Sequence, residues 1–210
     1  RLRSKSDRLD QGFLAAVIGS TRFTNYVLGV QTGSAVPHIS GRQIGEFEFD
    51  LPPLNVQRSI SGVLGALDNK IESNRRVVSI AEALGDAMFA NIGREQVALV
   101  EVADLTMGSS PPGSSYNENG EGLPFYQGIR DFGRRFPGLR VWTTEAIRIA
   151  EANDTLFSVR APVGELNRAS ERCCIGRGIA SIRSTAPSTI FYALRAAGRL
   201  WTPYQQEGTV

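Results

Sequence analysis

The side chains of this 210-residue chain that are best suited to binding chemistry lie in two neighbouring stretches of its second half. Residues 109–122 are rich in Gly, Pro, Ser and Asn, and residues 125–135 place Gln and Arg among aromatic side chains. Gln forms paired hydrogen bonds with adenine and Arg with guanine, while Ser, Tyr and backbone N–H groups hold phosphates. The two stretches therefore predict a nucleic-acid contact surface. Its candidate residues are Ser114, Tyr116, Asn117, Gln127, Arg130, Arg134 and Arg135.

The charge balance of the same region favours this interpretation. Residues 121–183 hold ten Arg against seven Asp or Glu, an excess of three. A modest basic face of this kind is what a base-reading module needs. For each arginine taken alone, a solvated surface with ordinary ion pairs is the favoured alternative, whereas for the set as a whole DNA contact is favoured. The net charge of the chain, +2, indicates no particular partner.

Arrangements typical of catalysis are missing from the sequence. His38 is the only histidine and the two cysteines, Cys173 and Cys174, are adjacent, so no metal-site spacing arises. The sequence has no Gly-rich phosphate loop with Lys, and neither the Asn-Pro-Pro-Tyr nor the Asp-Pro-Pro-Tyr motif of adenine methyltransferases. We therefore expect a non-catalytic protein without a metal or cofactor of its own. The cysteines fit a reducing cytoplasm, and no apolar run is long enough to predict a membrane span.

A long helix over residues 53–93 is the main element that must position these loops. Pro53 fits the first helical turn and Gly93 the residue past the end. Apolar residues recur at heptad spacing, and eight of the ten seam positions are apolar and not Gly. The 39 residues between Pro53 and Gly93 span roughly 58 Å as a helix, at about 1.5 Å per residue, which predicts a spacer that pairs with a second helix. The predicted interface consists of Ile60, Leu64, Leu67, Ile71, Asn74, Val78 and Met88.

Two features of this helix make the pairing matter. Gly62, Gly65 and Gly85 lie inside it, and each costs about 1 kcal/mol relative to Ala, so burial of the seam must supply the stability. Asn74 lies near the centre of the seam. Either it fixes the register and the number of partner helices, or it is a tolerated polar residue at a poorly packed position.

Two motifs resemble a known family, the DNA-specificity subunits of type I restriction-modification systems. The first resembles the conserved helix that joins the two target-recognition domains of such a subunit. The second is similar to a motif of the recognition domains themselves. The matching residues of the first motif are Leu51, Pro52, Pro53, Leu54, Gln57, Arg58, Leu67, Asp68, Lys70, Ile71 and Asn74, and those of the second run from Val159 to Gly164 and from Ile175 to Gly178.

The resemblance implies an α+β fold, in which a mixed α/β target-recognition domain is joined to a long coiled-coil-forming helix. It implies that residues 1–52 end a first recognition domain, residues 53–93 form the spacer and dimerisation helix, and residues 94–210 form an incomplete second recognition domain. Such a subunit reads a split site in double-stranded DNA and positions methyltransferase and restriction subunits. Those partner subunits would bring S-adenosylmethionine, ATP and Mg.

The second motif adds two arginines to the candidate DNA contacts, Arg160 and Arg177. They either pair with carboxylates in the scaffold or contact the DNA backbone, and the scaffold role is favoured for each. A short internal echo, residues 1–4 against 181–184 and 31–36 against 206–210, favours a duplicated unit.

Local patterns predict further elements on both sides of the long helix. They are a helix over 9–27, a strand over 44–49, one or two strands over 97–105, strands over 156–159 and 179–182, and a helix over 190–201.

The alternative function is a decayed or truncated helical assembly module that binds a partner protein without DNA specificity. A segment of a fused methyltransferase–nuclease would change the context but not the role. Because residues 94–210 keep their Arg, aromatic and strand patterns, DNA recognition is the favoured function. We interpret the chain as a fragment or a truncated subunit. We expect an antiparallel homodimer, in which the strand predicted over residues 44–49 of one copy completes the recognition domain of the other copy.

Overall fold

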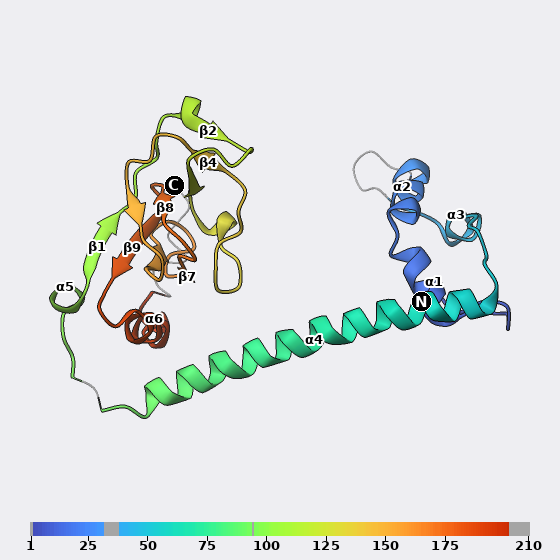
Figure 1. Ribbon diagram of the computed structural model, residues 1–210, viewed down its shortest axis with the longest axis horizontal. Helices are drawn as coiled ribbons and strands as arrows, with labels where there is room; N and C mark the ends of the chain where they lie inside the picture. The colour runs from blue at the N-terminus through green and yellow to red at the C-terminus, as the bar shows by residue number, and fades with distance from the viewer. Residues whose placement is uncertain (1, 32–37, 94, 202–210) are drawn as a thin grey trace. The chain divides into compact units, whose positions relative to one another are not determined.

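The structure, a computed structural model, describes residues 2–31, 38–93 and 95–201 (Figure 1). It forms two compact units, Arg1–Ala81 and Glu82–Val210, whose boundary falls within the long helix. The predicted α+β class is confirmed. The helices are α1 (Gln11–Ile18), α2 (Thr21–Val30), α3 (Gly41–Gly45), α4 (Leu54–Ala90), α5 (Leu99–Val102) and α6 (Pro187–Ala196), with 3-10 turns η1 (Gly113–Ser115), η2 (Ile129–Asp131) and η3 (Gly198–Leu200). The strands are β1 (Asp104–Met107), β2 (Tyr116–Asn117), β3 (Leu123–Tyr126), β4 (Trp142–Thr143), β5 (Ile149–Ala150), β6 (Thr155–Ser158), β7 (Leu166–Arg168), β8 (Cys173–Ile175) and β9 (Ile179–Arg183).

The described part of the first unit is helical, and two predictions for it need correction. The single helix predicted over 9–27 is divided into α1 and α2, because the Ser20 hydroxyl accepts a hydrogen bond from the Phe23 N–H and caps a new helix. The strand predicted over 44–49 is wrong. Ser40 and Gln43 form a capping box that starts α3, and Phe47 beyond it packs edge-on against Phe23 instead of joining a ladder.

The predicted long helix is confirmed as α4, with 37 residues. Its first turns are anchored by Gln57, which is fully buried. The Gln57 amide accepts a hydrogen bond from the Asp10 N–H (2.9 Å) and donates to the carbonyls of Arg8 (2.9 Å) and Pro52 (2.7 Å). The Ser61 hydroxyl also donates to the Asp10 carboxylate, and this bond lowers the pKa of Asp10 below its usual value. The Gln of the first sequence motif thus has a structural role.

The apolar seam of α4 is uncovered in the single chain. Ile60, Leu67 and Ile71 are 38%, 55% and 48% exposed, and the remaining seam residues of the predicted interface, Leu64, Asn74, Val78 and Met88, are exposed as well. A helix that leaves this much apolar surface in water needs a partner to be stable.

The second unit contains two sheets, and its buried apolar side chains form two clusters. A four-stranded antiparallel sheet has the order β1-β9-β6-β7, and a five-stranded sheet has the order β2-β4-β3-β8-β5 with β3 and β8 parallel. Tyr126, Leu156, Ile175 and Ile179 are almost completely buried between them. The strands predicted over 156–159 and 179–182 are confirmed as β6 and β9. The run over 97–105 gives the short helix α5 before β1, and the predicted last helix begins earlier, at Pro187, with η3 at its end.

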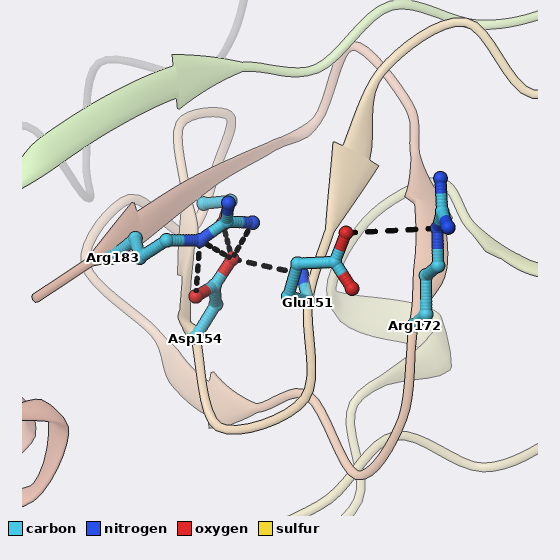
Figure 2. Close-up of polar contacts among 5 residues, drawn as sticks. Glu151, Asp154, Arg172 and Arg183 are labelled. Carbon is cyan, nitrogen blue, oxygen red and sulfur yellow. Dashed lines mark hydrogen bonds and ion pairs between the residues drawn. The ribbon is translucent and has the colours of Figure 1, made fainter.

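An ion-pair network fastens β9 to the turn before β6 (Figure 2). The Asp154 carboxylate, only 4% exposed, accepts hydrogen bonds from the Arg183 guanidinium (2.8–3.2 Å), the Ser181 hydroxyl (2.8 Å) and the Glu151 N–H (2.9 Å). The bond to Asp154 raises the pKa of Arg183. The neighbouring pair of Glu151 and Arg172 is longer, 3.6 Å, and exposed.

The last turns of α4 belong to the second unit and carry helix α6. Asp86 pairs with Arg195 at 2.9 Å, and a methyl group on Gly85 would overlap the Tyr192 hydroxyl. Gly85 is therefore a contact point for α6 in this structure, although the heptad pattern places it in the seam.

No single helix in the described ranges is both long and apolar enough to cross a membrane. Helices α1 and α2, which meet at a bend of 58°, pass the same test only as a pair.

Candidate nucleic-acid interface

Four segments of the second unit meet at an open hollow of about 320 Å³. They are the loop after β1, the turn after β3, the segment after β6 and the turn between β8 and β9. The hollow is lined by Ser110, Gln127, Gly128, Ile129, Arg130, Arg160, Ala161, Arg177 and Gly178. Four of the nine predicted DNA contacts, Gln127, Arg130, Arg160 and Arg177, therefore lie together.

Backbone hydrogen bonds join the segments that form the hollow. The Gly176 N–H donates to the Tyr126 carbonyl (2.8 Å) and the Gly178 N–H to the Gln127 carbonyl (3.1 Å). The Val159 N–H then donates to the Gly178 carbonyl (3.0 Å), which brings in the segment after β6. These bonds hold the turns after β3 and β8, and the end of β6, at one edge of the core.

The Gly-Arg-Gly sequence after β8 has a physical reason in this contact. A Cβ atom on Gly178 would collide with the carbonyl oxygen of Gln127, and one on Gly176 would lie 3.1 Å from the Cα of Gln127. Only residues without side chains allow the two turns to approach this closely. Arg177, between the two glycines, is left with an exposed side chain at the hollow.

Asp131 stabilises the turn after β3 through hydrogen bonds of its buried carboxylate. Its carboxylate is 1% exposed and accepts hydrogen bonds from the Gln127 N–H (2.7 Å) and the Arg140 guanidinium (2.7 Å). Asp131 is not among the lining residues, and its charge is compensated by Arg140. The sequence pattern singled out neither residue, and no spacing signal marks their pairing.

The hollow is strongly basic. Arg130, Arg160 and Arg177 are exposed, and within the part of the chain that the structure describes none of the three has an ion pair or a side-chain hydrogen bond. No Asp or Glu is among the lining residues. The scaffold role that the sequence favoured for Arg160 and Arg177, pairing with carboxylates, is not seen among the described residues, and their contact with the DNA backbone stays a prediction.

Two other predicted arginines are used inside the second unit. The Arg134 guanidinium pairs with Glu82 of α4 at 3.0 Å, and the Arg135 guanidinium lies over the Phe191 ring of α6, 3.9 Å from its centroid. Both side chains therefore connect the loop after η2 with the helices. Contact of Arg134 and Arg135 with DNA stays a prediction.

Two of the three candidates in the loop 109–122, Tyr116 and Asn117, stabilise that loop. The Tyr116 hydroxyl donates to the Pro111 carbonyl (2.9 Å), and the Asn117 amide donates to the Glu121 carbonyl (2.8 Å) and accepts from its N–H (2.9 Å). Ser114 lies exposed in η1, outside the hollow. Ser110 of the same loop lines the hollow, although the sequence gave it no mark beyond its place in a Ser-rich run.

The two cysteines and the metal-binding side chains can be assessed in the described ranges. Cys173 and Cys174 are buried and unpaired, and burial raises the pKa of Cys173 to about 12, so its thiol stays neutral and unreactive. No group of three His, Cys, Asp or Glu side chains that could hold a metal ion is found among these residues.

The fold and the hollow define a class of protein: an α+β domain with clustered, exposed arginines, joined to a long helix with an open apolar seam. No family model matches the chain. It is 33% identical over 183 residues to the MjaX specificity subunit of a type I restriction enzyme from Methanocaldococcus jannaschii. This alignment covers 74% of this chain and 43% of that protein.

Solved structures agree with this relationship. The HsdS subunit from Thermoanaerobacter tengcongensis is 32% identical, with a TM-score of 0.52 over 96% of this chain and 56% of that one. The type I restriction-modification S subunit from M. genitalium, 15% identical with a TM-score of 0.64, covers 95% of this chain and 56% of its own, and shows the fold alone. The chain belongs to the specificity subunits of type I restriction-modification systems, and it spans about half the length of the relatives it matches.

Proposed function

We propose that this chain recognises a specific sequence in double-stranded DNA as the specificity subunit of a type I restriction-modification complex. The observation that carries the proposal is the meeting of Gln127 and three arginines, which have no ion pair among the described residues, at one hollow of the second unit. Clustered Arg in a hollow whose lining holds no Asp or Glu is the electrostatic footprint of a nucleic-acid site. Its position in a domain related to specificity subunits supports sequence recognition as the purpose of that site.

The partners follow from the same proposal. The chain, itself non-catalytic and cytoplasmic, positions methyltransferase and restriction subunits on its DNA site. S-adenosylmethionine, ATP and Mg are used by those subunits.

The open seam of α4 supports a further part of the proposal, a second helix paired with the first. A second copy of this chain supplies that helix as an antiparallel homodimer, which would place two recognition domains about a twofold axis and give a palindromic split site. The wrong strand prediction at residues 44–49 removes one element of the earlier expectation: the described part of the first unit has no strand with which to complete a neighbour.

A binding selection tests the function. The chain, assembled with the methyltransferase subunit of its system, is incubated with a random duplex library, and bound DNA is recovered and sequenced. We expect one split consensus, and an affinity for it that falls linearly in log–log form as the salt concentration rises. Recovery of DNA without any consensus would show that the chain is the alternative, an assembly module without specificity.

A further inference from the structure

We propose that the hollow holds the phosphate backbone of the DNA and that it positions the recognition domain without reading bases. This inference rests on the proposed function and assigns one part of the DNA to one part of the protein. It departs from the sequence interpretation of Gln127, which predicted contact with adenine.

Shape gives the first reason. Base edges lie on the floor of a groove about 8.5 Å deep and about 12 Å wide, so the side chains that read them must project from a convex element. The site here is concave, and its arginines surround an open volume of about 320 Å³. A concave site is complementary to a group that projects from the duplex, and on DNA that group is the phosphate.

Charge and chemistry give the second reason. The lining residues that carry charge are Arg130, Arg160 and Arg177, all exposed and without an ion pair among the described residues. Ser110 adds a hydroxyl and Gln127 an amide, and both groups donate hydrogen bonds to phosphate oxygens in protein–DNA interfaces. The edge of a base carries no net charge, whereas each phosphate carries one negative charge. Three arginines around one hollow therefore match adjacent phosphates of one strand.

The way in which the hollow is built gives the third reason. Its arginines come from three segments that backbone hydrogen bonds and the close approach of Gly178 to Gln127 fix relative to one another. The backbone positions from which the arginines extend are thus fixed, which suits a ligand group that is identical at every position of DNA. Reading a variable base is then left to other exposed loops of the domain.

The experiment measures how binding depends on salt for variants that remove one charge each. Duplexes carrying the selected consensus and duplexes of random sequence are titrated by fluorescence anisotropy against the assembled complex at several chloride concentrations. The variants are Arg130→Gln, Arg160→Gln, Arg177→Gln and Gln127→Ala. Arg148→Gln is the matched control, because Arg148 is an exposed arginine of the same unit that does not line the hollow.

Each hollow arginine variant should reduce the slope of log affinity against log salt by about 0.9, the contribution of one phosphate contact. It should weaken binding to consensus and random duplexes by the same factor, so that their affinity ratio is unchanged. Gln127→Ala should weaken both duplexes equally with the slope unchanged, and Arg148→Gln should change neither quantity.

Three outcomes would overturn the assignment. In the first, a hollow variant changes the preferred base at any position of the consensus, which would make the hollow a base-reading site. In the second, all three arginine variants keep the wild-type slope. In the third, submillimolar inorganic phosphate displaces the duplex at constant ionic strength, which would assign the hollow to a free anion. A wild-type complex without sequence preference would contradict the proposed function, and the slopes on random DNA would still decide the role of the hollow.

Discussion

The arginines of the second unit fall into two groups. Some form ion pairs with carboxylates that stabilise the fold, and others have no ion pair among the described residues. Arg183 and Arg140 each reach a nearly buried carboxylate, on Asp154 and Asp131. Such a carboxylate has little access to water, so its hydrogen bonds to the guanidinium are essential for its burial. The pair of Glu151 and Arg172, by contrast, is exposed on both sides.

Replacing Asp154 by Ala should therefore lower the free energy of unfolding by about 1–3 kcal/mol, because Arg183, Ser181 and the Glu151 N–H lose their common acceptor. Replacing Glu151 by Ala removes only an exposed ion pair at 3.6 Å and should cost less than about 1 kcal/mol. Urea unfolding followed by circular dichroism measures both values. Equal losses for the two variants would show that the network of Figure 2 does not stabilise the sheet as described.

At the scale of one element, helix α4 has different tasks along its length. Its start binds the N-terminal segment through Gln57, its middle exposes the seam, and its end receives α6 at Gly85 and Asp86. The glycines follow these tasks. Gly62 has no atom within 4 Å of a Cβ position, whereas at Gly85 the space is filled by Tyr192.

The same substitution should consequently have opposite signs at the two positions. Gly62→Ala should raise the free energy of unfolding by about 0.5–1 kcal/mol, the gain in helix propensity. Gly85→Ala should lower it, because the new methyl group displaces the Tyr192 ring. In a Tyr192→Ala background the Gly85→Ala change should become stabilising, which a double-mutant cycle by urea unfolding can establish. If Gly85→Ala stabilises the wild-type chain, α6 does not rest on α4 at this point.

For the whole molecule, assembly depends on the helix that covers the apolar seam of α4. Each unit has contacts of its own, but the apolar seam residues between Ile60 and Val78 are 38–55% exposed in the single chain. Apolar residues at heptad spacing are stable in water only when a second helix covers them. In this family member the partner is, by our proposal, the same helix of a second copy.

Replacement of Leu67 or Ile71 by Asp should convert a dimer into monomers, since each change would bury an unpaired charge in the helix interface. Asn69→Asp is the matched control, because it adds the same charge to an exposed position on the opposite side of α4. Multi-angle light scattering of the chain gives the masses. A wild-type monomer, or a dimer that survives both seam substitutions, would contradict the pairing, and equal dissociation by Asn69→Asp would show a general charge effect.

The sequence alone determined the features that depend on neighbours in the chain. Periodicity over residues 53–93 predicted α4, short β-rich runs predicted β6 and β9, and the two motifs predicted the family. Local patterns failed at residues 44–49, where the alternation resembles a strand but the Ser40 capping box starts a helix instead. Helix periods, caps and turns are set within a few residues, so a sequence records them directly.

Only the tertiary structure decided which predicted residues act together. Gln127, Arg160 and Arg177 are distant in sequence and meet because the parallel pairing of β3 with β8 and the glycines of the next turn bring their segments together. Arg134 and Arg135, which closely follow Gln127 in the sequence, contact Glu82 and Phe191 instead. Whether a guanidinium is free or paired depends on carboxylates and rings that the fold places within a few ångströms, and residue type and spacing do not contain those distances.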